Sequence, residues 1–67
     1  MELSARNQLK GKVTKITLGN VMAEVVVQVG ANEVVTAITR SSVERLGIKV
    51  GDEVFAIVKA TEVMIAK

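Results

Sequence analysis

Hydrophobic and polar residues alternate along most of the chain, which is the pattern of half-buried β-strands. The first stretch of alternation runs through Leu9, Gly11 and Val13, with lysine and threonine between and after them. The apolar phase then moves by one residue, to Ile16 and Leu18. A one-residue shift inside a strand is typical of a β-bulge or a strong bend. We therefore predict that the first strand is bent.

Turn signals divide the remainder of the chain into four more predicted strands. The second is the clearest of these, because an apolar residue occupies every second position from Val21 to Val29. Glycine marks each predicted turn between strands of this region. The predicted strands cover residues 21–29, 33–39, 53–59 and 61–66, and the turns lie at Gly19-Asn20, Gly30-Ala31-Asn32 and Val50-Gly51-Asp52.

A helix of one to two turns is predicted between the third and fourth strands. Ser41 with Glu44 three residues later forms a capping box, and Gly47 is placed for a left-handed C-cap. Three strands, a helix and two strands follow one another in the OB-fold, a five-stranded Greek-key barrel. We predict that residues 1–67 form a single, mainly β domain with this OB-like barrel. An SH3-like barrel is the structural alternative, but it has no natural place for the capped helix.

Composition excludes several kinds of chemistry. The chain has no His, Cys, Trp, Tyr or Pro, and Phe55 is its only aromatic residue. A metal site with His or Cys ligands, a disulfide, a Ser-His-Asp triad and a thiol nucleophile are therefore excluded. Thirteen valines indicate a β protein. We expect a binding or structural module and not an enzyme.

The size of the chain favours self-association. A domain of about 60 residues buries only about 60% of the surface that its unfolded chain exposes. Hydrophobic residues nevertheless make up 49% of the sequence, more than so small a core needs. We therefore expect apolar surface to be buried between subunits. No apolar run is long enough to span a membrane and no signal peptide is evident, so we expect a cytoplasmic protein.

The amino-terminal part of the chain carries most of the positive charge. Residues 1–19 have a net charge of +3, whereas the whole chain has +2. Within this part, Ser4, Ala5 and Arg6 offer a hydroxyl, backbone N–H groups and a guanidinium, which are all donors suited to an oxyanion. A frayed terminus or the lead-in to a strand is the alternative interpretation of the same residues.

Lys59 and a group of hydroxyls are further candidates for anion binding. By alternation, Lys59 shares a largely apolar face with Phe55 and Ile57. An ammonium group on such a face either reaches along its stem to water or meets a bound anion or a carboxylate. Hydroxyls also gather where the third strand gives way to the helix, although capping alone would explain Ser41. These hydroxyls belong to Thr39, Ser41 and Ser42.

Binding of single-stranded nucleic acid is an alternative function, because OB-folds often serve it. That function requires aromatic platforms for base stacking along a positively charged groove. One aromatic residue and a net charge of +2 make nucleic-acid binding a weak alternative, and we expect no nucleic-acid partner.

Three segments of the sequence match a known family pattern. They are Ser4-Ala5-Arg6-Asn7-Gln8-Leu9-Lys10-Gly11, the set Ile38-Thr39, Ser42-Val43 and Leu46-Gly47, and Val58-Lys59-Ala60-Thr61-Glu62-Val63-Met64-Ile65. Together they resemble the molybdenum–pterin-binding (Mop) domain of the molbindins, over essentially the whole chain. The resemblance implies an OB-like fold, binding of molybdate or tungstate for storage or homeostasis, and a homohexamer built as a trimer of dimers. A domain that docks on another protein in response to molybdate is the remaining alternative.

The resemblance also implies which residues hold the oxyanion. Ser4, Ala5, Arg6, Lys59 and Ala60 of one subunit would line a site, and Thr39 and Ser42 would come from a neighbouring subunit. A possible second site would involve the turn at Gly19 and Asn20. No residue would ligate the metal directly, because the metal is held as its oxyanion by N–H and O–H donors and one lysine. Ala60 stands where some relatives have Ser. We expect no organic cofactor such as a pterin, because the chain offers no aromatic pocket to stack one.

Overall fold

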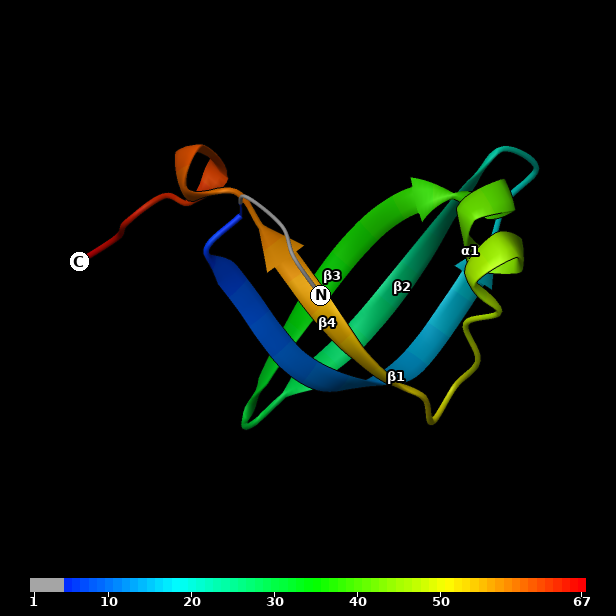
Figure 1. The fold of residues 1–67 in the computed structure, drawn as a ribbon, viewed down its shortest axis with the longest axis horizontal. Coiled ribbons are helices and arrows are strands. Elements are labelled where there is room, and N and C mark those ends of the chain that lie inside the picture. Colours follow the sequence, from blue (N-terminus) through cyan, green and yellow to red (C-terminus); the bar gives the residue numbers. More distant parts are fainter. Residues whose placement is uncertain (1–4) are drawn as a thin grey trace.

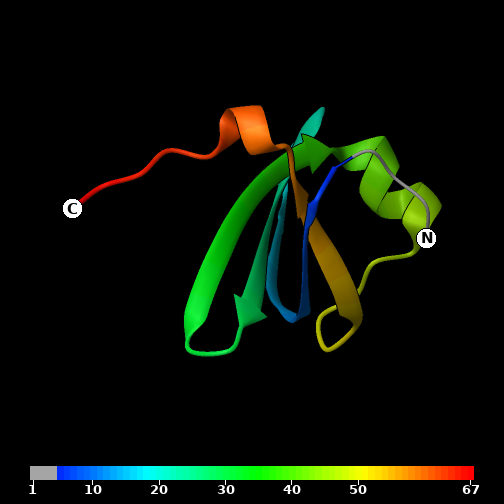
Figure 2. The same cartoon turned by 60° about the vertical axis from the view of Figure 1, so that its left-hand side comes forward.

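A computed structural model describes residues 5–67, which form one antiparallel sheet, one α-helix and one turn of 3₁₀-helix (Figure 1). The sheet is strongly curved (Figures 1 and 2), and α1 lies at one end of it while η1 lies at the other (Figure 1). The elements are β1 (Asn7–Leu18), β2 (Met22–Val29), β3 (Asn32–Thr39), α1 (Arg40–Leu46), β4 (Glu53–Val58) and η1 (Ala60–Glu62).

The strands are arranged in the order β3-β2-β1-β4, with every neighbouring pair antiparallel. Predicted bounds of the second, third and fourth strands agree with β2, β3 and β4 to within one residue. The predicted irregularity of β1 is confirmed: its register against β2 shifts between Val13 and Lys15. Thr14 is therefore the extra residue of a bulge, and β1 bends sharply along its length (Figure 1).

The core lies on the concave face of the sheet. Alternate residues of β2 point to this face, as their spacing predicts, and Val13 of β1 and Val43 of α1 complete the cluster. Because Val43 is the only residue that α1 contributes to it, this short helix covers one end of the core, and the strands supply the other buried residues. The buried residues of the cluster are Val13, Ala23, Val25, Val27 and Val43.

The helix starts earlier than predicted, so the capping-box assignment is wrong. Thr39, and not Ser41, is the N-cap: its backbone is extended and its Oγ1 accepts a hydrogen bond from the Ser42 backbone N–H at 3.1 Å. Glu44 pairs with Arg40 instead of closing a capping box. The predicted C-cap is confirmed, because Gly47 has φ of 65°. No helix within residues 5–67 is long and apolar enough to cross a membrane.

The predicted fifth strand is absent from the described chain, so the sheet has four strands and the barrel is open. After β4, the N–H groups of Glu62 and Val63 bond to the carbonyls of Lys59 and Ala60, and this tight turn directs the chain away from the sheet (Figure 1). The residues that follow extend into solvent, with Met64 92% and Ile65 90% exposed. Their apolar pattern is that of a strand, but this chain offers them no partner strand among residues 5–67.

Candidate functional site

Four of the predicted site residues meet in a hollow beside the start of β1. Antiparallel pairing of Asn7 with Val58 places the arm, by which we mean residues Ala5 and Arg6 before β1, next to the turn that follows β4 (Figures 1 and 2). The hollow has a volume of about 270 Å³. It is lined by Ala5, Arg6, Lys59, Ala60 and Thr61, and we refer to it as the arm hollow. Predicted residue Ser4 lies outside the described part of the chain.

Lys59 does not belong to a strand, in contrast to its predicted place on the face of Phe55 and Ile57. β4 ends at Val58, because Lys59 begins the 3₁₀ turn as its N-cap residue. Lys59 is exposed and lines the arm hollow from this turn, and it is not part of a sheet face.

The arm hollow carries positive charge, and none of the described residues that line it is acidic. Arg6 and Lys59 both line it. Within residues 5–67 the ion pairs are Lys10 with Glu53 and Arg40 with Glu44, so no described carboxylate neutralises either cation of the hollow. Two cations next to exposed backbone favour an anion, and an arginine offers several donors to it in a fixed geometry.

The sequence did not single out two residues that shape the arm hollow. Thr61 lines it and adds a hydroxyl next to Ala60. Gln8 does not line it, but its side-chain Nε2 donates a hydrogen bond to the carbonyl oxygen of Ala5 at 3.0 Å. Both residues lie in segments that match the family pattern, yet neither alternation nor charge distinguishes them from ordinary strand and turn residues.

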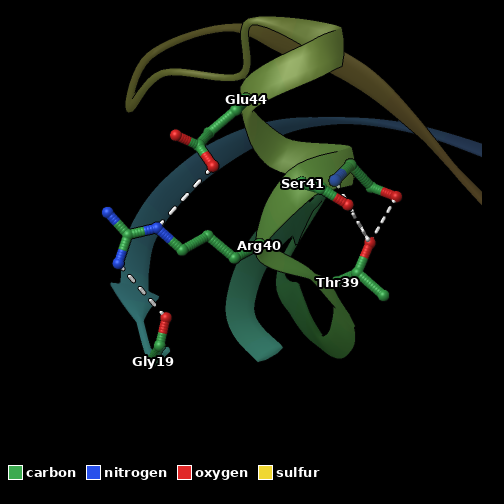
Figure 3. A network of polar contacts seen from close by, with 6 residues as sticks. Gly19, Thr39, Arg40, Ser41 and Glu44 are labelled. Atoms are coloured by element: carbon green, nitrogen blue, oxygen red, sulfur yellow. Dashed lines mark hydrogen bonds and ion pairs between the residues drawn. The ribbon is translucent and has the colours of Figure 1, made fainter. Parts of the chain in front are cut away.

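The other two predicted site residues lie at the start of α1. Thr39 Oγ1 and Ser42 Oγ are 2.7 Å apart, and Thr39 Oγ1 is 3.3 Å from Ser41 Oγ (Figure 3). Since Thr39 Oγ1 already accepts from the Ser42 N–H, the contact between the two hydroxyls uses one hydroxyl proton. The second proton of this pair can be donated to Ser41 or to a ligand.

The turn predicted as a possible second site lies beside this group of hydroxyls. Asn20 and Thr39 line a second hollow of about 280 Å³, whose remaining lining residues are Val21, Arg40, Ser41 and Glu44. Arg40 connects the turn to the helix: its Nη1 is 3.4 Å from the Gly19 carbonyl oxygen, and its Nε is 3.7 Å from Glu44 Oε1 (Figure 3). The structure thus brings together residues that the sequence assigned to two different sites.

A single chain does not bring Thr39 and Ser42 to the arm hollow. The start of α1 and the start of η1 are at opposite ends of the sheet (Figure 1), and the molecule is 35 Å along its longest axis. The resemblance implies that the two groups meet across a subunit interface, and this remains a prediction.

Comparisons with known proteins cover nearly the whole chain. The family model described as "TOBE domain" matches residues 3–65. Molybdenum-pterin-binding protein 2 of Clostridium pasteurianum is 53% identical over 66 residues, which are 97% of each protein. The solved structure of a molybdate-binding protein from Sporomusa ovata covers 100% of both chains at 45% identity, with a TM-score of 0.96.

Two further solved structures are also similar to this chain. MopII from Clostridium pasteurianum is 51% identical, with a TM-score of 0.92, over 98% of this chain and 100% of its own. ModG, described as a cytoplasmic molybdate-binding protein, is 38% identical with a TM-score of 0.89, and the match spans 96% of this chain and 46% of ModG. The chain therefore belongs to the TOBE-domain family and, within it, to the molybdenum-pterin-binding (Mop) proteins.

Proposed function

We propose that this protein binds molybdate, and tungstate in the same way, and that it stores the oxyanion in the cytoplasm. The observation that carries the proposal is the arm hollow, where Arg6 and Lys59 are free of described carboxylates. Relatives of the same length are named for molybdenum–pterin binding, and similar solved structures are described as molybdate-binding. The names of the relatives include a pterin, but this chain has only Phe55 to stack on one.

The chemistry of molybdate fits a site of this kind. Molybdate is a tetrahedral dianion that carries only hydrogen-bond acceptors at neutral pH, so N–H and O–H donors with nearby positive charge satisfy it. A phosphate that keeps a proton needs an acceptor, which such a site lacks. Sulfate, also a dianion without a proton, must be rejected by the size of the cavity. Tungstate resembles molybdate in size and charge, so we expect little discrimination between them.

We further propose that the oxyanion is held between subunits of a homohexamer. Thr39 and Ser42 of a neighbouring subunit would complete the donors of the arm hollow, together with Ser4, Ala5 and Ala60 of the first. The turn at Gly19 and Asn20 would serve a second site, for which the hollow at Asn20 and Thr39 offers the space.

Two apolar features that no residue among 5–67 covers support self-association. The concave face is open between β3 and β4, and it forms a groove of about 350 Å³ with an apolar lining that includes Val34, Ile38 and Val54. The tail at Val63–Ile65 is apolar and exposed. Open sheet edges and exposed apolar segments invite pairing with another chain. A second copy of the chain can cover both features, because its apolar tail matches the apolar lining of the groove.

Replacement of Lys59 tests the proposed site. In Lys59→Ala, loss of a charged donor should weaken molybdate binding by about 10- to 100-fold, as measured by isothermal titration calorimetry. Lys15→Ala is the matched control, since Lys15 is an equally charged, exposed residue of β1 that lines neither hollow. Equal affinity of the two variants, with both folded by circular dichroism, would contradict the assignment of Lys59.

A further inference from the structure

A side-chain hydrogen bond ties the arm before β1 to the sheet. Gln8 belongs to β1, where its backbone is paired with Ile57 of β4. Its side chain reaches back three residues, and Nε2 donates to the Ala5 carbonyl oxygen at 3.0 Å in a partly buried position. The arm residue Ala5 thereby gains a fixed contact with a regular strand.

This contact also sets the orientation of the peptide between Ala5 and Arg6. A peptide group is planar, and no cis peptide occurs within residues 5–67, so its C=O and N–H point in opposite directions. Because the Ala5 carbonyl points to Gln8, the Arg6 N–H points away from Gln8. Ala5 and Arg6 line the arm hollow, and Gln8 does not. If the peptide turned over, a carbonyl oxygen would point where the Arg6 N–H now points, and a carbonyl oxygen repels an anion.

We propose that Gln8 is a positioning residue of the oxyanion site. Its amide holds the Ala5–Arg6 peptide so that the arm presents an N–H group, and not a carbonyl oxygen, to the bound anion. This inference rests on the proposed function of the arm hollow. It assigns Gln8 no contact with the anion itself.

The chain supplies a matched control for this interaction. Gln28 also uses its Nε2 to donate to a main-chain carbonyl, that of Gly30, at 2.9 Å. Gln28 lies at the end of β2 beside the turn into β3, and it lines neither of the two hollows. Replacement by methionine keeps the length of either side chain and removes one side-chain donor to a main-chain carbonyl, at the arm in Gln8→Met and at an exposed turn in Gln28→Met.

The experiment compares these variants with the wild-type chain by NMR relaxation without ligand and by calorimetry with sodium molybdate. In Gln8→Met we expect the order parameter of the Arg6 amide to fall from about 0.85 toward 0.6. We also expect molybdate to bind about 5- to 10-fold more weakly, the loss of one hydrogen bond that orders the arm. Gln28→Met should keep both values, and both variants should unfold within about 5 °C of the wild-type temperature, the scale of a change of about 1 kcal/mol in a domain of this size. Gln8→Leu, which also lacks the donor and adds no charge, should repeat the result.

The outcomes separate this inference from the proposed function. Wild-type affinity and a rigid Arg6 amide in Gln8→Met would overturn the positioning role while leaving molybdate binding intact. A loss of affinity matched by a large fall in unfolding temperature would also overturn it, since Gln8 would then serve the fold only. If the wild-type chain binds no molybdate, the proposed function fails and the role of Gln8 toward an anion fails with it.

Discussion

At the scale of single residues, Gly11 shows how closely the two central strands approach each other. A Cβ atom at this position would lie 2.5 Å from the Gln28 carbonyl oxygen and 2.7 Å from Val27 Cγ1. Only a residue without a side chain fits there, because both neighbours belong to the packed strand β2. Gly11 thus allows β1 to cross β2 tightly just before the bulge at Thr14.

Gly11→Ala should therefore destabilise the protein by about 1–3 kcal/mol, the usual cost of forcing extra volume into a packed region. Chemical denaturation with urea measures this change in the free energy of unfolding. Lys12→Ala is the control on the same strand, and its exposed position should keep the change within about 0.5 kcal/mol. Equal stability of Gly11→Ala and wild type would show that β1 can move away from β2 at no cost.

At the scale of secondary structure, short-range signals predicted most elements. Alternation located β2 and β4, the glycine turn after β2 located β3, the phase shift located the bulge, and glycine located the end of α1. The start of α1 was misplaced because Thr39 and Ser41 are both good capping residues, and sequence spacing alone favoured the wrong one. The choice depends on where β3 ends, and Thr39 is still paired with Met22 there.

The two candidate caps make different predictions for stability. Thr39→Ala removes the acceptor of the Ser42 N–H and should cost about 1 kcal/mol in the free energy of unfolding. Ser41→Ala removes only a hydroxyl contact at 3.3 Å and should cost less than about 0.5 kcal/mol. Urea denaturation of both variants tests this, and a larger effect at Ser41 would place the cap where the capping box predicts it.

At the scale of the whole molecule, the sequence did not predict which strands and site residues come together within one chain. The tail has a short apolar run that is typical of a strand, but a strand forms only where a partner strand is available, and residues 5–67 of one chain supply none. The predicted site divides in the same way, since Arg6 and Lys59 meet in the arm hollow while Thr39 and Ser42 lie at the other end of the sheet. Local patterns cannot say which contacts are made within a chain and which between chains.

The proposed assembly links the open groove, the tail and the divided site. If a second copy covers the groove and the tail, the oligomer and the complete site form together. Deletion of residues 63–67 should then release monomers and weaken molybdate binding, although Ala5, Arg6 and Lys59 are all retained. A truncated chain that keeps the oligomeric state and the affinity of the full chain would show that the tail serves neither.

Native mass spectrometry of the full chain, with and without sodium molybdate, tests the central proposal most directly, because it reads subunit number and bound mass in one spectrum. We expect a hexamer that gains the mass of several molybdate ions on addition of the salt. A monomer that gains no oxyanion mass at molybdate concentrations well above those of the protein would contradict both the function and the assembly proposed for this chain.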